Sequence, residues 1–289
     1  MDKFSFQCYL CGCTEYIQRE GHARDNKNLF PLECKQCRLV QLSTFEHIVD
    51  NFYEEAHMHD NMPIDIELLK NKAQEDTDRR FAQFSHEIEG KDILDFGCGT
   101  GDFLLKAKSI AKSVTGIEPE RRLNQYFKHN NLTVYNSIDD MPEDKTFDVI
   151  TLFHVLEHIK DPVSMLKRLK NYMKEKKKSL CIIEVPSSTD ALLTLYKNKA
   201  FSVFTYWSCH LFLFNENTLK KCVEDAGIKT LKIEQFQRYP ITNHLYWLAE
   251  GKPGGQYIYI YNKELAEAYK NWLTQQKICD TIIGYFYCD

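Results

Sequence analysis

The sequence predicts an α/β protein in which helices wrap both faces of a mostly parallel sheet, with a small metal-binding module at the N-terminal end. Three observations lead to this prediction. Two Cys-x-x-Cys pairs lie within the first 40 residues, a glycine-rich turn joins an apolar strand to a helix, and apolar strands alternate with helical segments from residue 91 onward. Such alternation is typical of parallel sheets whose strands are buried on both faces.

The N-terminal cysteines have the spacing of a tetrahedral metal site. Two Cys-x-x-Cys pairs with 22 residues between them can bring four thiolates around one zinc ion. Four ligands leave no open position, so we expect a structural zinc ribbon over residues 1–45. Cys13 and His22 are alternative ligands. The expected ligands are Cys8, Cys11, Cys34 and Cys37.

A long amphipathic helix precedes the predicted sheet. Between Ile64 and Ile88, apolar residues recur at steps of three and four, and Gly90 is suited to end the helix. Residues 46–90 are therefore predicted to form a linker and a helix that covers the sheet.

A glycine turn follows the first strand of the predicted sheet. Asp95 ends the strand, and Gly97, Gly99 and Gly101 allow backbone angles and a close approach of a ligand that side chains would forbid. A dinucleotide site would need glycine where Asp102 stands, and a carboxylate there would repel a pyrophosphate. The turn therefore favours a cofactor without phosphates.

The second strand also ends in a carboxylate. Glu118 lies 23 residues after Asp95, with a helical stretch between them, and is followed by Pro119. A carboxylate at this position can accept hydrogen bonds from both hydroxyls of a ribose. The alternative is an acidic residue at a helix N-terminus.

The order Asp-x-Gly-x-Gly-x-Gly resembles motif I of the class I S-adenosylmethionine (SAM)-dependent methyltransferases. The resemblance implies a Rossmann-like, mostly parallel seven-stranded sheet and a loop that holds the aminoacyl part of SAM. It also implies contacts to adenine from the turn after the third strand, and two residues beside the sulfonium after the fourth. The expected cofactor-binding residues are Asp95, Gly97, Cys98, Gly99, Gly101, Phe103, Glu118, Pro119, Ser137, Ile138, Phe153 and His154.

The segment after the fourth strand contains the candidate catalytic residues. Its His-x-Leu-Glu-His order, from His154 to His158, resembles that of small-molecule methyltransferases of the ubiquinone and sugar types. In similar zinc-containing sugar C-methyltransferases, the Glu-His pair lies in the active site, which implies this role for Glu157 and His158. His210, in a segment similar to methyltransferases of surface-carbohydrate loci, is a third candidate base for a hydroxyl. A turn-stabilising Glu-His pair and a core histidine are the alternatives.

The resemblance predicts a methyltransferase core over residues 91–238, with an acceptor-binding insertion over 186–215 and a C-terminal extension over 239–289. An alternating Tyr-Ile pattern predicts a strand over 257–261 within the extension. The predicted activity is methyl transfer to a hydroxyl of a carbohydrate or nucleotide-linked sugar of a surface glycan. Sugar C-methylation, a quinone-like acceptor and a non-catalytic SAM-fold module remain alternatives.

Charge and hydropathy exclude some partners. The 37 Lys and Arg residues against 41 Asp and Glu residues leave a net charge of −4, which offers no electrostatic footprint for nucleic acid. No leader pattern and no run of about 18 apolar residues occurs, so we expect no membrane insertion and a cytoplasmic location. The sequence leaves the oligomeric state open.

Overall fold

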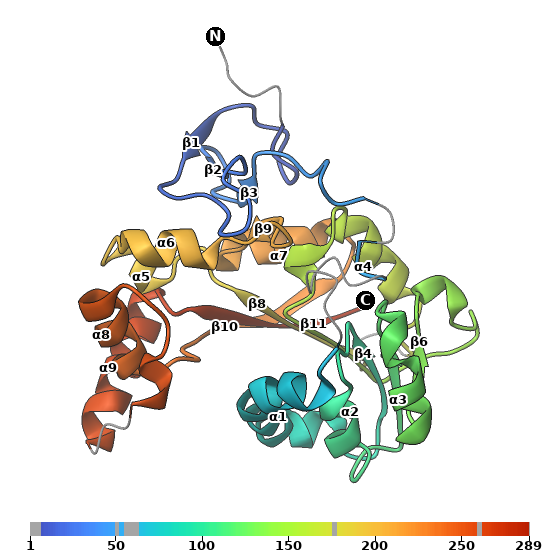
Figure 1. Cartoon of the computed structure of the whole chain (residues 1–289). Helices are drawn as coiled ribbons and strands as arrows, with labels where there is room; N and C mark the ends of the chain where they lie inside the picture. Colours follow the sequence, from blue (N-terminus) through green and yellow to red (C-terminus); the bar gives the residue numbers. More distant parts are fainter. Residues whose placement is uncertain (1–6, 50–51, 55–63, 175–177, 259–261, 289) are drawn as a thin grey trace.

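A seven-stranded sheet forms the centre of the molecule (Figure 1). The computed structural model describes residues 7–49, 52–54, 64–174, 178–258 and 262–288. The strand order is β10-β11-β8-β7-β4-β5-β6, and β11 alone among them runs antiparallel to its two neighbours. The predicted Rossmann-like fold is thus confirmed. The strands are β4 (Asp92–Phe96), β5 (Ser113–Ile117), β6 (Thr133–Tyr135), β7 (Val149–Phe153), β8 (Leu180–Pro186), β10 (Lys229–Phe236) and β11 (Thr281–Tyr287).

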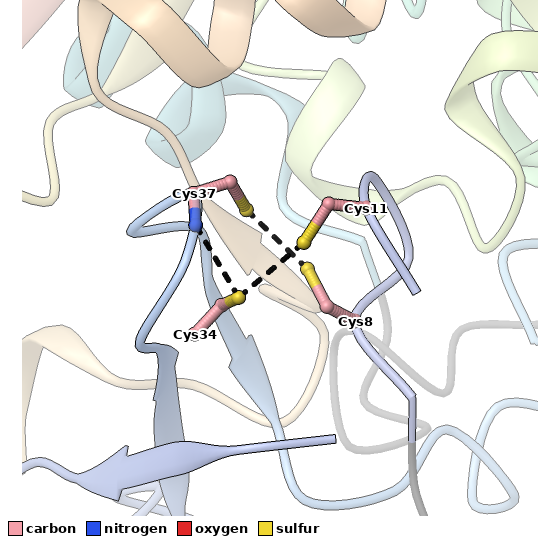
Figure 2. Close-up of side chains that lie close together, drawn as sticks. All are labelled: Cys8, Cys11, Cys34 and Cys37. Atoms are coloured by element: carbon pink, nitrogen blue, oxygen red, sulfur yellow. Dashed lines mark hydrogen bonds between the residues drawn. The ribbon is translucent and has the colours of Figure 1, made fainter. Parts of the chain in front are cut away.

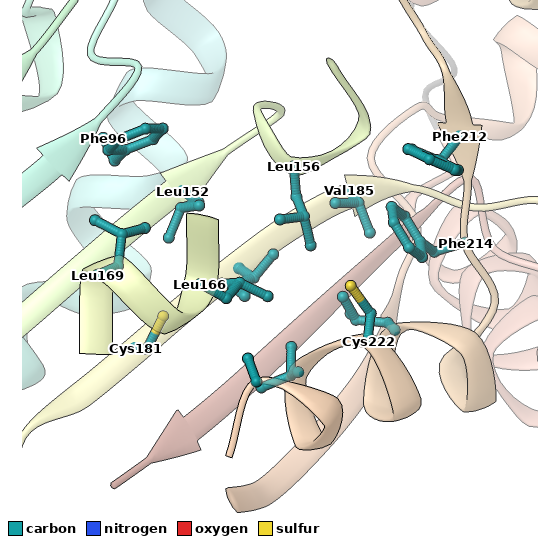
Figure 3. Packing of buried hydrophobic residues seen from close by; sticks show 14 of the residues in the cluster. Phe96, Leu152, Leu156, Leu166, Leu169, Cys181, Val185, Phe212, Phe214 and Cys222 are labelled. Atoms are coloured by element: carbon teal, nitrogen blue, oxygen red, sulfur yellow. The ribbon is translucent and has the colours of Figure 1, made fainter. Parts of the chain in front are cut away.

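Alternate side chains of the central strands pack against helices on opposite faces of the sheet. Ile93 and Val149 contribute to a core with α1 and α2, whereas Leu94 and Ile150 contribute to a core with α4 and α7. Figure 3 shows the second core, in which Leu166 and Leu169 of α4 approach the sheet. The helices involved are α1 (Ile66–Ile88), α2 (Asp102–Ala107), α3 (Asn124–His129), α4 (Pro162–Lys170) and α7 (Glu216–Asp225).

The covering helix forms where the sequence predicts it. Asp65 caps α1 by accepting a hydrogen bond from the backbone N–H of Leu68, and Gly90 follows the last turn with a φ of 65°. Phe84 and Ile88 are fully buried against the sheet. In the described parts of the chain, every helix is too short or too polar to span a bilayer.

The C-terminal region differs from the prediction. Gly255–Tyr257 forms a 3-10 turn, η5, in place of the start of a strand; residues 259–261 lie outside the described residues. The turn packs tightly on helix α8 (Ile241–Glu250), since a Cβ on Gly255 would lie 2.4 Å from the backbone oxygen of Thr242. Helix α9 (Lys263–Gln276) then leads into β11, which the sequence analysis did not anticipate.

The N-terminal module shares its sheet with the insertion. Strands β1 (Tyr16–Gln18), β2 (Pro31–Cys34) and β3 (Val40–Leu42) pair antiparallel, and β9 (Phe212–Leu213) adds the fourth strand by pairing with β3. The backbone N–H of Leu42 also donates to the carbonyl of Leu211 at 3.0 Å. Helices α5 (Ala191–Thr194) and α6 (Lys199–Thr205) complete the insertion between the module and the central sheet (Figure 1).

Close packing beneath the glycine turn yields a stability prediction. A Cβ on Gly116 of β5 would lie 2.7 Å from the Sγ of Cys98 and 2.9 Å from a methyl carbon of Leu104. We expect Gly116→Ala to lower the free energy of unfolding by about 1–3 kcal/mol through overpacking, measured by urea denaturation. Adding Cys98→Ala should recover part of the loss. A Gly116→Ala protein as stable as the wild type would contradict this packing.

Candidate active site

The loop after β4 has the conformation that a glycine turn requires. Gly97, Gly99 and Gly101 have φ angles of 75°, 53° and 75°, in the left-handed region. A Cβ on Gly97 would lie 2.4 Å from a methyl carbon of Val155, so no other residue fits there. The N–H of Gly97 donates to the carbonyl of Ile117 at 2.8 Å, which joins the loop to the end of β5.

Glu118 connects the ends of the first two parallel strands. Its Oε2 accepts from the N–H of Gly99 at 2.8 Å, and its Oε1 accepts from the N–H of Glu120 at 3.1 Å. Burial raises the pKa of Glu118 to about 7, against the effect of these two donors. The carboxylate therefore shapes the turn, and it also lines the adjacent space.

That space is a cavity of about 420 Å³ at the carboxyl ends of β4, β5 and β7. Ligands of open α/β sheets bind at this edge. Of the expected cofactor-binding residues, those that line the cavity are Gly97, Gly99, Glu118, Pro119 and His154.

The other expected cofactor residues lie behind the cavity wall. Asp95 is buried and accepts from the hydroxyl of Thr151 at 2.7 Å, and burial raises its pKa to about 6. The Cys98 thiol packs in a core cluster beneath the loop, so only its backbone belongs to the turn. The remaining ones support the loops from below: Gly101 caps α2, Phe103 and Phe153 pack edge to face, Ser137 caps the turn η3, and Ile138 is buried.

Several cavity residues were not anticipated from the sequence. Ile48 and Tyr53 come from the linker before α1, a segment with no clear hydrophobic period. The Tyr53 hydroxyl donates to the carbonyl of His158 at 3.1 Å, which fixes Tyr53 at this side of the cavity. Further unpredicted lining residues are Phe96, Ile117, Glu120, Val155, Ile159, Lys160 and Met165.

His154 is held between two carboxylates. Its φ is 56°, a conformation that turns the chain sharply after β7. Its Nδ1 lies 3.4 Å from Oε1 of Glu157, and its Nε2 lies 3.1 Å from Oε1 of Glu184. Burial opposes the charged form, but these carboxylates raise the pKa of His154 above its usual value.

Glu184 belongs to a buried ionic network that the sequence analysis missed. It is fully buried in β8, and its Oε1 accepts from Arg79 at 2.8 Å and Arg80 at 2.7 Å, both in α1. Although burial opposes ionisation, Arg80 and His154 keep the pKa of Glu184 well below its usual value. A lone carboxylate inside the apolar strand 180–186 was the signal that could have revealed the network.

The four candidate catalytic residues form one cluster beside the cavity, which His154 and His158 line. The rings of His158 and His210 lie 4.8 Å apart, and Nε2 of His158 lies 4.0 Å from Oε1 of Glu157. Burial lowers the pKa of His158, and lowers that of His210 to about 3. The interaction with His154 in turn lowers the pKa of Glu157 against the effect of burial. At neutral pH the cluster thus combines two neutral imidazoles with an anionic carboxylate.

The predicted cysteine ligands gather in the N-terminal module (Figure 2). Their four Sγ atoms lie within 4.8 Å of one another, with 3.4 Å between Cys8 and Cys37 and 3.5 Å between Cys11 and Cys34. A Zn–S distance near 2.3 Å implies sulfur atoms about 3.8 Å apart, so the four thiols fit a tetrahedral zinc ion. The alternative ligand Cys13 instead contacts the backbone of residue 15.

Comparison with known protein families identifies the family to which the core of the chain belongs. A family model described as a methyltransferase domain matches residues 68–233, more than half of the chain. The chain belongs to this methyltransferase family. Its core is a methyltransferase domain, and the site described above lies within the matched region except for the linker residues.

Individual relatives match the methyltransferase over short segments. A tRNA U34 carboxymethyltransferase of Nautilia profundicola is 36% identical over 92 residues, which cover 29% of this chain and 31% of that protein. A mitochondrial ubiquinone biosynthesis O-methyltransferase of Candida albicans is 31% identical over 120 residues, 36% of each chain. The methyltransferase therefore spans only about a third of the length of these curated relatives.

A solved structure shares the overall fold. A SAM-dependent methyltransferase from Thermotoga maritima superimposes with a TM-score of 0.54 at 14% identity, covering 82% of this chain and 100% of that one. At this identity, the similarity concerns the fold alone.

The position of Glu118 yields a binding prediction. If the carboxylate accepts from the SAM ribose, Glu118→Gln should weaken SAM binding by about 1–3 kcal/mol, as for a lost charged hydrogen bond. Because its pKa is about 7, the wild-type affinity should fall as the pH drops below 7 and the acceptor is protonated. Isothermal titration calorimetry between about pH 6 and pH 8 measures both effects.

The variant itself should lose this pH dependence, while the exposed-site control Asp144→Asn should keep it. An unchanged dissociation constant in Glu118→Gln would remove the ribose assignment.

Proposed function

We propose that the methyltransferase transfers the methyl group of SAM to a hydroxyl of a small polar acceptor, of the carbohydrate or nucleotide-linked sugar class. The observation that carries this proposal is the gathering of His154, Glu157, His158 and His210 at the edge of the cavity. We also propose that the residues expected from the sequence to bind the cofactor or to catalyse the reaction have these roles.

For methyl transfer, the protein has to align the acceptor hydroxyl with the methyl group and to remove the hydroxyl proton. Bound SAM supplies a methyl group on a sulfonium; as the acceptor oxygen bonds to the methyl carbon, the carbon–sulfur bond breaks and its electron pair stays on sulfur. The acceptor proton passes to the cluster of His158, His210 and Glu157, whose imidazoles are neutral at physiological pH. His154, fixed by two carboxylates, positions this cluster against the cavity.

The insertion supports a carbohydrate acceptor. It brings His210 and Trp207 to the cluster, with their rings 5.5 Å apart, and Tyr53 lines the cavity from the opposite segment. Aromatic faces of this kind are suited to stack on a sugar ring. The resemblance of the His210 segment to methyltransferases of surface-carbohydrate loci also supports a carbohydrate acceptor.

A quinone-like acceptor is the second candidate. It is favoured by the ubiquinone biosynthesis relatives and by apolar lining residues such as Ile48, Ile159 and Met165. We do not propose a tRNA acceptor, although other relatives are named for one, because a chain of net charge −4 lacks the excess basic charge that binds phosphate backbones.

We also propose that residues 1–45 form a zinc ribbon, of which the structure describes residues 7–45. All eleven cysteines are free of disulfides, which suits a reducing, cytoplasmic location. Zinc in this module would hold β2 and β3 in place, and through the β3–β9 pairing it would hold the segment that carries His210. Residues 46–90, 91–238 and 239–289 are the proposed linker and covering helix, core and extension.

The acceptor class is tested by a competition among candidates. The full chain is incubated with methyl-labelled SAM and, separately, nucleotide-linked sugars, simple glycosides, a catechol and tRNA, and products are identified by mass spectrometry. We expect an O-methylated sugar, and a methylated catechol alone would favour the second candidate. Methylation of tRNA alone, retained at high salt, would overturn the proposal.

The zinc ribbon is tested with Cys34→Ser. Loss of one thiolate should release the ribbon metal and unfold the module, since small modules of this kind fold with their metal. We expect methyl transfer to fall strongly while SAM binding, which depends on the core, is retained; metal analysis and calorimetry measure these. The matched control is Cys13→Ser, which lies outside the cluster. Unchanged zinc content in Cys34→Ser would count against the ribbon.

A further inference from the structure

Three side chains at the acceptor edge of the cavity have the arrangement of a second metal site. His158 ends the turn η4 (Leu156–His158), and Cys209 and His210 are separated from β9 by Leu211 alone. One ligand atom from each of the three lies within 4.8 Å of the other two. This group is separate from the four cysteines of the N-terminal module.

Unpartnered buried atoms surround this group. The Nδ1 atoms of His158 and His210 are buried without a hydrogen-bond partner, and so are both carboxylate oxygens of Glu157, which is fully buried. A buried carboxylate without a hydrogen-bond donor is costly. Its Oε1 is 3.4 Å from an imidazole nitrogen of His154 and 4.0 Å from one of His158. The cluster therefore contains buried nitrogen and oxygen atoms without hydrogen-bond partners, and such atoms are able to bind a cation.

The backbone around the three side chains is already fixed. The N–H of Leu211 donates to the carbonyl of Glu157 at 2.8 Å, which holds the insertion against η4. The ring of His47 contacts the carbonyl of Ser208 at 2.7 Å, and the N–H of Ser208 donates to Asp25 at 3.0 Å. Both partners belong to the N-terminal part of the chain, so the ligands come from distant segments that are held in register.

We propose that His158, Cys209 and His210 bind a divalent transition-metal ion, with zinc as the ion that best matches two imidazoles and one thiolate. Zinc prefers nitrogen and sulfur ligands, and a site with three protein ligands keeps one position open. The Cys209 thiolate and the nearby Glu157 carboxylate together balance the two positive charges of the ion. His158 lines the cavity, so this site borders the proposed acceptor position.

The role of this ion rests on the proposed function, whereas the metal site itself rests on the geometry alone. An acceptor hydroxyl bound at the open position becomes more acidic. Its proton passes to Glu157, its oxygen forms the bond to the methyl carbon, and the electron pair of the broken carbon–sulfur bond stays on sulfur. The metal undergoes no change in oxidation state.

Metal stoichiometry tests the site without using activity. The full-length protein is reconstituted with zinc, desalted and analysed by inductively coupled plasma mass spectrometry. We expect two zinc ions per wild-type chain, one in His210→Ala and in Cys209→Ala, and two in the controls His129→Ala and Cys279→Ala. His129 is exposed, and Cys279 is a buried cysteine outside the cluster.

A measurement on the wild type removes any dependence on how the variants fold. The zinc X-ray absorption spectrum should contain imidazole scattering, which four cysteine ligands do not produce. A sulfur-only spectrum with one zinc per chain would overturn the proposal, as would two zinc ions retained in both His210→Ala and Cys209→Ala. Absence of sugar methylation would refute the proposed acceptor while leaving these metal counts unchanged, so the two failures are distinguishable.

Discussion

The ionised carboxylate of Glu184 in the middle of the sheet is the constraint on which the active site depends. A buried charge of this kind is stable only when it is paired and hydrogen-bonded, and removal of a partner is strongly destabilising. Two arginines of α1 provide the pairing, so the covering helix has to pack against β8 in one register. The same carboxylate contacts His154. His154 in turn contacts Glu157, which lies close to His158. The ionic network thus links the helix before the core to the chemistry at the end of β7.

The second organising contact is the pairing of β9 with β3. A two-residue strand has little stability of its own, and here it completes a sheet whose other strands surround the cysteine cluster. This pairing places Cys209 and His210 opposite η4. The N-terminal module therefore helps to position the proposed acceptor side of the site, even though none of its four clustered cysteines lies there.

The comparisons and the structure divide the molecule in the same way. The region shared with known methyltransferases contains strands β4 to β8, the glycine turn and Glu118, which are the parts expected to handle SAM. The module before it and α8, α9 and β11 after it lie outside that region, while the insertion interrupts it. Because cofactor chemistry is common to the family and acceptors differ, specificity is expected to lie in these surrounding parts.

Local patterns were enough to predict the α/β core. Strand and helix periods, the glycine turn, Glu118 and the paired cysteines are signals carried by neighbouring residues, and the confirmed fold follows from them. Strand β11 and the 3-10 turn at Gly255–Tyr257 were not predictable in this way, because an apolar or alternating run takes its conformation from the surface on which it packs. The pairing of Glu184 with Arg79 and Arg80 spans more than 100 residues. The gathering of His158, Cys209 and His210 likewise depends on which strands lie side by side, and sheet order is a property of the folded chain that no local pattern contains.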